Sequence, residues 1–438
     1  MKSTVIKTAV CLLSALLWAA VVHARPPASV KYSTTRVENP RGIRNSLVIP
    51  YAFSSDSMGF TAGVGGGMRG YGQDQLLVAG TAWASFDGGA GGILGLWDYR
   101  IPWFQRLFLS AFGSAGYYPN QRAYANAPRP PGVPRSGSND SGETDFVEDS
   151  GWDNQTDFRL EYVLPLGSAR HQAMAAYHLK GGLLTAGASG GDVWNPLSSG
   201  VSVVVLRQFN RYQSFNTDFG KKDYTVHPVQ LGLYYNNTDF AVNPSRGSSQ
   251  FLGVTRDFGW LESDQSWTFL EFEASKYVSL GDSRWAQQRI VALNFWTGDS
   301  PTWETTVDAN GNEVVQNAPP FTQGANLGGF YRMRGYPFNR FHDRSVIYTT
   351  AEYRYTLKWN PLGNVSWLKF LNTDWMQLVG FVEGGRVADA YDLGELFSNW
   401  KFDAGAGLRF LMSGGVIRLD FAVSDEGSQI WAMFGHPF

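Results

Sequence analysis

The stretch FDAGAGLRFLMSGGVIRLDFAV, from Phe402 to Val423, predicts two antiparallel strands joined by a tight turn. In each half, apolar or small residues alternate with a second set of residues that includes Arg409, Arg418 and Asp420. A period of two places each set on one face of a strand. Between the halves, Ser413-Gly414-Gly415 has the composition of a hairpin turn. The stretch therefore predicts a hairpin with one apolar face and one charged face.

The charged face distinguishes between two all-β folds. The segment from Ser345 to Lys358 repeats the alternation, with its charges again on one face. A soluble sandwich also alternates, but it would have to bury these charges on its inner faces. A membrane barrel accepts them, because its apolar face meets lipid and its polar face lines a watery lumen. The charges concerned are Glu352, Arg354, Asp403, Arg409, Arg418 and Asp420.

Composition supports a membrane barrel. Aromatic residues make up 15% of the chain and charged residues only 17%, and there are 50 glycines. No segment after the N-terminal region reaches the roughly 18 uninterrupted apolar residues of a membrane-spanning helix. A closed β-barrel is the other structure that satisfies every backbone group in lipid. The net charge of -2 and the pI of 6.3 give no support to nucleic-acid binding.

The N-terminus predicts export. Lys2 and Lys7 precede an apolar run from Ala9 to Val22, and Val22-His23-Ala24 is a small-residue cleavage pattern. We therefore expect residues 1–24 to be a signal peptide, 25–46 a short periplasmic segment and 47–438 the barrel. Cleavage would remove Cys11, the one cysteine of the chain.

The same alternation predicts about sixteen barrel strands, the even number typical of bacterial barrels. Three long connections are expected outside the cell: Pro119 to Gly151, Ala186 to Val226 and Gly298 to Arg344. Two segments fit this scheme badly. Val201 to Leu206 is strand-like within an expected loop, and Trp359 to Asp374 is long for a periplasmic turn. The expected strands are Leu47–Phe53, Gly59–Arg69, Asp74–Ser85, Gly89–Asp98, Arg106–Tyr118, Trp152–Leu164, Arg170–Thr185, His227–Thr238, Ser248–Phe258, Trp267–Ser279, Ser283–Thr297, Ser345–Lys358, Met376–Gly384, Lys401–Leu411, Val416–Ser424 and Gln429–Phe438.

The longest C-terminal loop contains GGFYRMRGYPFNRFHD, Gly328 to Asp343, where arginines gather among glycines and aromatics. Here the chain resembles the BamA/TamA superfamily of outer-membrane barrels, the bacterial surface-antigen family. Met333-Arg334-Gly335-Tyr336 stands at the family's loop motif, and Phe381 to Val387 is similar to its strand motif, with Phe381 and Gly385 in matching places. Ala351 to Arg354 matches the acid on the strand after the loop.

The resemblance implies a function in inserting, assembling or translocating protein or lipid at the bacterial outer membrane. Its implied partners are outer-membrane lipids and other periplasmic or outer-membrane proteins. Two departures stand out. Glu383 occupies the place where the family has aspartate, and residues 25–46 are too few for a periplasmic POTRA domain, because even marginal domains need about 40 residues.

The arginine loop also has a physical interpretation. A guanidinium group offers carboxylates a planar fork. If the loop folds into the lumen, Arg334 can meet Glu383 and Glu352, Gly335 can approach the wall closely, and Tyr336 can stack nearby. We therefore expect Arg334 to lock the loop inside the lumen and narrow the pore. The alternative is a solvated external loop whose arginines have no such partners.

The barrel seam is the second candidate feature. Pro50 in the first strand and Pro437 in the last cannot donate to a ladder. The seam at Pro50 and Phe438 is therefore expected to close weakly, which would suit the lateral gate that the resemblance implies. Alternatively, Pro50 lies before the true strand.

Catalytic and ligand motifs are weak. Gly187-Ala188-Ser189-Gly190-Gly191 has the letters of a serine nucleophile elbow, without its strand, turn and helix. Gly65 to Gly70 resembles a dinucleotide fingerprint only by its letters. The histidines show no metal-ligand spacing. We therefore expect no cofactor, no metal and no enzyme, and the alternative function is a passive porin-like channel.

Overall fold

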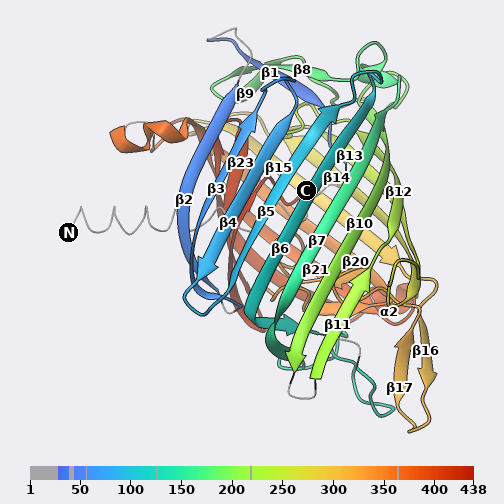
Figure 1. Cartoon of the computed structure of the whole chain (residues 1–438). Helices are drawn as coiled ribbons and strands as arrows, with labels where there is room; N and C mark the ends of the chain where they lie inside the picture. Colours follow the sequence, from blue (N-terminus) through green and yellow to red (C-terminus); the bar gives the residue numbers. More distant parts are fainter. Residues whose placement is uncertain (1–27, 39–43, 56, 125–126, 218–219, 363–364) are drawn as a thin grey trace.

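The computed structural model describes residues 28–38, 44–55, 57–124, 127–217, 220–362 and 365–438. Within these residues, sixteen antiparallel strands make up the wall of one continuous sheet that curls into a barrel (Figure 1). This confirms the predicted fold class and strand number. The barrel strands are β2 (Asn45–Ser55), β3 (Gly59–Arg69), β4 (Leu77–Ser85), β5 (Ala90–Arg100), β6 (Leu107–Ala123), β7 (Val147–Val163), β10 (Val201–Thr217), β12 (Val229–Asn236), β13 (Gly247–Phe258), β14 (Ser266–Ser279), β15 (Ala286–Asp299), β20 (Ser345–Leu357), β21 (Thr373–Ala388), β22 (Lys401–Met412), β23 (Gly415–Ser424) and β24 (Gly427–Phe434).

Each barrel strand pairs with the next barrel strand along the chain. A further strand, β11 (Gly220–Val226), pairs with the second half of β10, while β12 pairs with the first half. We call the end at which β2 begins and β24 ends the terminal rim, and the opposite end the loop rim. The loop rim carries the hairpins β16 (Glu304–Val307) with β17 (Glu313–Gln316) and β18 (Ala325–Leu327) with β19 (Phe341–Asp343), and helix α2 (Leu393–Leu396).

The strands alternate as a membrane barrel requires. On β12 to β14, large apolar side chains at every second position are exposed, and the intervening positions line the lumen. The exposed set includes Leu231, Leu233, Leu252, Val254, Leu270 and Phe272. Among the described residues, no helix is long and apolar enough to cross a membrane.

One predicted barrel strand is wrong. Instead of a strand over Arg170–Thr185, the chain forms the short helix η1 (Gly167–Ala169), then β8 (Ala175–Lys180) and β9 (Leu183–Ala186), outside the barrel. The seventh barrel strand is β10, so Val201 to Leu206 lies in the wall and not in an external loop. The run is apolar on both faces because Ala28 and Val30 cover the lumen side of Val203 and Val205. One error cancels the other, which is why the count of sixteen holds.

The N-terminal segment crosses the barrel at the terminal rim. Its strand β1 (Tyr32–Arg36) pairs parallel with β8, and β8 pairs with β9, giving a three-stranded sheet separate from the wall (Figure 1, top). Arg36 binds Asp374 at the start of β21 through two hydrogen bonds of 2.6 and 2.7 Å. The predicted signal peptide, residues 1–24, lies outside the described residues.

The long turn between β20 and β21 contains the 3₁₀ helix η2 (Ser366–Leu371). Leu368 and Leu371 of this helix pack against apolar residues of β22 and β23. The turn is long because it contains this helix, which packs against the wall.

Candidate functional site

The lumen loop, Gly328 to Arg340, folds into the barrel. Met333, Arg334 and Tyr336 are fully buried. Gly328 and Gly329 both have φ of +107°, and Met333 has φ of +55°, so the backbone turns sharply where it enters the loop motif. The arginine loop is thus a packed element and not a solvated external loop.

Arg334 lies among carboxylates from three strands of the C-terminal part of the wall. Its Nη1 atom is 2.9 Å from Glu352 Oε1 of β20 and 2.7 Å from Asp420 Oδ2 of β23. Its Nη2 atom is 3.2 Å from Glu383 Oε1 of β21, and its backbone N–H donates to the other oxygen of Glu383 at 2.5 Å. The guanidinium carbon is 3.4 Å from the centre of the Phe381 ring, within range of a cation–π contact. The structure therefore brings together Arg334, Glu352, Glu383 and Phe381, and adds Asp420.

Further arginines of the wall bind the same carboxylates. Arg354 and Arg409 bind Glu352 at 2.8 and 2.7 Å, and Arg418 binds Asp420. With Arg334 and Asp403, the network holds four guanidinium groups and four carboxylates, all with at most 5% of their surface exposed. Buried charges on this scale persist only when paired and hydrogen-bonded. The four arginines are Arg334, Arg354, Arg409 and Arg418; the carboxylates are Glu352, Glu383, Asp403 and Asp420.

Gly335 and Tyr336 bind the next part of the wall. The Gly335 N–H donates to Asp403 Oδ2 at 3.0 Å, and its carbonyl accepts from Ser424 Oγ at 2.9 Å. A Cβ atom on Gly335 would lie 2.6 Å from Asp403 Cβ and 3.0 Å from the Val423 backbone, so only glycine fits. The Tyr336 hydroxyl lies 3.1 Å from the Phe402 carbonyl oxygen and 2.6 Å from Asp425 Oδ1, and its one proton can be donated to either acceptor. Tyr336 is thus fixed by hydrogen bonding as well as by its ring contact with Phe341.

Gly385 of β21 gives the loop room on another side. A Cβ atom there would lie 3.0 Å from Leu327 Cδ1, so the missing side chain lets β18 approach the wall. Two further arginines of the lumen loop bind other parts of the wall: Arg332 binds Glu273 of β14 at 3.0 Å, and Arg340 binds Glu426 of the β23–β24 turn at 2.7 Å. The arginines gather in this loop because each contacts a different part of the lumen wall.

A second buried ion cluster was not predicted from the sequence. Lys31 of the N-terminal segment is fully buried, with Nζ 2.9 Å from Asp98 of β5 and 2.7 Å from Glu161 of β7. The Ser29 N–H donates to Glu161 at 3.0 Å, and its hydroxyl donates to Asp98 at 3.2 Å. The available signal was that both acids lie on lumen faces of predicted strands.

The seam between the first and last barrel strands has no backbone ladder. Among the strands that the structure describes, β2 pairs only with β3, and β24 pairs only with β23. Pro50 lies within β2, opposite Val64, so the alternative that Pro50 precedes the strand is wrong. The expectation that Pro437 lies in the last strand is also wrong: β24 ends at Phe434, and Gly435, with φ of +76°, turns the chain.

Phe438 consequently lies away from the seam edge. Its ring stacks on Tyr277 of β14, with ring centres 6.2 Å apart, and Arg354 lies over it at 5.1 Å. His436 is buried beside it, with Nδ1 2.6 Å from Arg409 Nη1. The end of the described chain thus enters the lumen (Figure 1).

The two edges of the sheet overlap instead of pairing. The register places Leu47 and Ile49 of β2 opposite Gly67 and Gly65, on the lumen side of the sheet. Ile49 nevertheless packs with Phe410, Met412 and Ile417, which lie on the lipid side of β22 and β23, and with η2. The inner face of one edge therefore covers the outer face of the other, and side-chain packing replaces a hydrogen-bonded ladder.

The weak catalytic motifs have structural explanations. Ser189 is buried, and its hydroxyl bonds to the Tyr177 hydroxyl at 2.7 Å and donates to the Thr238 carbonyl at 3.0 Å. The residues from Gly65 to Arg69 belong to β3 and no helix follows, so the dinucleotide fingerprint lacks its βαβ unit. No cluster of three or more potential metal ligands occurs among the described residues.

The sheet, its apolar outer face and its charged lumen define an outer-membrane β-barrel. A family model described as the Omp85 superfamily domain matches residues 195–434, more than half of the chain. The chain therefore belongs to the Omp85 superfamily, whose members act in membrane insertion or secretion. The match agrees with the resemblance seen in the loop and strand motifs.

Three solved outer-membrane proteins are similar to this chain at low sequence identity. CdiB from Escherichia coli is 11% identical, with a TM-score of 0.53, over 89% of this chain and 62% of that chain. BamA from Haemophilus ducreyi lacking POTRA domains 1–3 is 12% identical, with a TM-score of 0.47, over 91% of this chain and 71% of that one. CdiB from Acinetobacter baumannii is 10% identical, with a TM-score of 0.47, over 90% and 60%. This chain thus spans less than two thirds of either CdiB chain, and no curated protein matches it.

Proposed function

We propose that this barrel inserts or assembles client molecules, protein or lipid, at the outer membrane, and that clients reach the membrane through the overlapped seam. The observation that carries the proposal is that no ladder joins β24 to β2 among the described strands. Opening the seam would break apolar side-chain packing but no backbone hydrogen bonds between the two edges. In lipid, where broken backbone bonds are costly, such an edge opens more readily than a paired one.

The lumen loop supports the same function. Arg334 and its carboxylates fasten the loop to β20, β21 and β23, in the C-terminal part of the wall that ends at the seam. Buried ion pairs are weak evidence for stability, but they can fix register. We propose that Arg334 holds the C-terminal wall in one register while the β2 edge moves, and that the loop narrows the pore.

A thiol crosslink across the seam tests this function. The Asn45 side chain donates to the Ser413 carbonyl at 3.0 Å, so cysteines at these two positions lie within reach of a bifunctional maleimide. Vesicles containing the crosslinked Asn45→Cys/Ser413→Cys protein should fold an unfolded β-barrel client no faster than empty vesicles. The same protein before crosslinking should accelerate client folding. Equal acceleration in both states would rule out movement at the seam.

Bilayer conductance separates this function from a passive channel. The lumen contains the arginine loop and the N-terminal segment, so we expect small, flickering currents from the intact protein. A steady open pore of porin size would favour the channel instead. The crosslinking test has a matched control, the single Ser413→Cys variant treated with the same bifunctional maleimide. This variant cannot form the crosslink and should accelerate client folding as the untreated protein does.

A further inference from the structure

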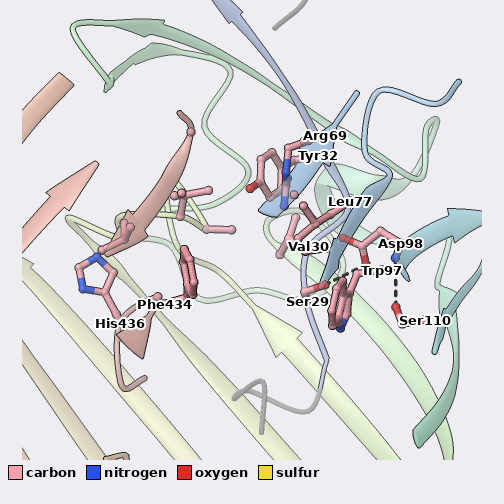
Figure 2. Close-up of a pocket in the computed structure, with 18 of the residues that line it drawn as sticks. Ser29, Val30, Tyr32, Arg69, Leu77, Trp97, Asp98, Ser110, Phe434 and His436 are labelled. Atoms are coloured by element: carbon pink, nitrogen blue, oxygen red, sulfur yellow. Dashed lines mark hydrogen bonds between the residues drawn. The ribbon is translucent and has the colours of Figure 1, made fainter. Parts of the chain in front are cut away.

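A cavity of about 480 Å³ lies where the seam meets the lumen (Figure 2). This volume is within the range of small-molecule sites, roughly 300 to 1,000 Å³. One side is the lumen face of β2 and β3, including Leu47 and Ile49. The other side is the end of β22 and the last described residues, including Met412 and Phe434. The cavity therefore extends from the lumen into the overlap between the two sheet edges.

Glycines create much of this space. Gly65 and Gly67 of β3 line the cavity on the lumen side. A Cβ atom on Gly65 would meet nothing closer than 3.4 Å, so a side chain would fit at this position. The space is open because the residue is glycine. Aliphatic and aromatic side chains make up most of the remaining wall, and polar side chains that include Asp98, Arg159 and Glu273 also line it. Apolar walls next to a membrane seam favour a hydrocarbon ligand.

Three side chains that line the cavity, Arg69, Arg159 and His436, each have a buried nitrogen atom without a hydrogen-bond partner among the described residues, and two of them bear on the ligand. His436 is 91% buried, since only 9% of its surface is exposed, and its Nε2 atom has no hydrogen-bond partner among the described residues. Arg69 stands at the end of β3 on the terminal rim, with its guanidinium 4.8 Å from the centre of the Tyr32 ring. Its Nη1 atom is buried and also without a hydrogen-bond partner in the described part of the chain. Buried donors without partners are costly, so both point to a ligand with acceptor atoms.

We propose that this cavity binds a membrane phospholipid with an anionic headgroup. One acyl chain enters through the seam and lies between the glycines of β3 and Phe434, and the phosphate accepts from Arg69 near the terminal rim. A seam held by side-chain packing alone gives the acyl chain a route from the membrane, and a guanidinium group matches a phosphate. The site holds lipid as a resident ligand, so it goes beyond the proposed function and does not require client insertion.

Photocrosslinking tests the acyl-chain site. The full-length protein is placed in phosphatidylglycerol nanodiscs that contain a phosphatidylglycerol with a diazirine at its acyl terminus. After irradiation, adducts are mapped to single residues by mass spectrometry. We expect adducts on the lumen-side residues Leu47, Ile49 and Ala79 in addition to the lipid-facing surface. Gly65→Val should reduce the lumen-side adducts at least about fivefold without changing those on the outer surface.

Matched variants and a second lipid complete the design. Gly113→Val adds the same side chain at a strand position where a Cβ meets nothing closer than 3.9 Å and which does not line the cavity, so it should retain the lumen-side adducts. Ala79→Leu fills the cavity from β4 and replaces Gly65→Val if that variant folds poorly. With a zwitterionic phosphatidylcholine probe, labelling should fall several-fold, as it should for Arg69→Gln with phosphatidylglycerol, and Arg69→Lys should restore part of it.

A different result would overturn each part of the proposal. Lumen-side adducts that are absent, or unaffected by Gly65→Val and Ala79→Leu, would overturn the site. Labelling of these residues only by a photoreactive unfolded client would assign the cavity to polypeptide and also overturn it. Equal labelling by the two headgroups would overturn the role of Arg69. Because no client is needed, a barrel that fails to insert clients but labels as expected would refute the proposed function alone.

Discussion

Removing the Arg334 side chain should destabilise the barrel strongly. Arg334→Ala leaves Glu352, Glu383 and Asp420 buried with one cation fewer. Losing one partner of a buried ion pair costs about 3 to 5 kcal/mol. We expect the temperature at which the folded form converts to the unfolded form in a heat-modifiability gel to fall well below that of the unaltered protein.

A surface pair provides the control for that measurement. Arg122 and Glu148 form an ion pair with 37% and 38% of their side chains exposed, and such pairs contribute at most about 1 kcal/mol. Arg122→Ala should therefore leave the conversion temperature nearly unchanged. Similar shifts for Arg122→Ala and Arg334→Ala would show that the lumen charges add no particular stability.

His342 makes the loop cluster sensitive to acid. Burial, followed by the positive charge of Arg135, holds the pKa of His342 well below its usual value near 6.5. The charged groups beside it are Arg135 and Asp343, which pair at 2.8 Å, and Trp303 contacts its ring. The unfolded loop can take up a proton on His342 that the folded loop excludes, so protonation favours the unfolded loop. The folded loop is therefore fully stable above a pH of about 6.5 and loses stability as the pH falls.

The predicted readout is proteolysis of the loop rim. Between about pH 7 and pH 5, cleavage within residues 300–344 should increase in the unaltered protein, measured with a protease active at both values. His342→Phe should remove most of this dependence, because phenylalanine does not titrate. An identical increase in the variant would assign the effect to other groups.

At the same scale, the sequence predicted part of the site. Arg334, Glu352 and Glu383 could be named because loop motif and strand motif stand in a recognisable order. Asp420 was seen to face the lumen, but its contact with Arg334 depends on the stagger of β20 to β23, which one sequence does not specify. The same uncertainty hid the contact between Lys31 and Asp98.

At the scale of elements, periodicity alone misassigned β8 and β10. The segment Ala175–Lys180 alternates as well as a barrel strand does, but its partner is β1 and not the wall. By contrast, β10 loses its alternation where the N-terminal segment covers its lumen face. Both errors arise from contacts between segments far apart in sequence, which local pattern cannot reveal.

The N-terminal segment should be released by a change at Lys31. Lys31→Ala leaves Asp98 and Glu161 buried without their cation, which we expect to cost about 3 to 5 kcal/mol. The segment can leave the lumen, so the result should be faster cleavage near β1 and a larger single-channel conductance. Lys180→Ala, at an exposed position of β8, is the control and should change neither. Unchanged protection in Lys31→Ala would mean that the β1–β8 pairing alone holds the segment.

For the whole molecule, composition and alternation were sufficient to predict a lipid-exposed barrel, whereas the count of sixteen strands was right only because the error at β8 offset the error at β10. The way in which its two edges meet was not predictable. Pro50 indicated a weak edge, but the overlap follows from packing among Ile49, Phe410 and η2, which are distant in sequence. The turn of the last residues into the lumen likewise depends on Tyr277 and Arg354.

The overlap of β2 with β22 and β23 has a geometric consequence. A barrel closed by hydrogen bonds between its first and last strands has one diameter, because strand number and shear set its radius. A sheet whose two edges overlap and are held only by apolar packing has no such fixed diameter. We expect the two edges to slide over each other. The diameter of the lumen can then change while the hydrogen bonds between neighbouring strands stay intact.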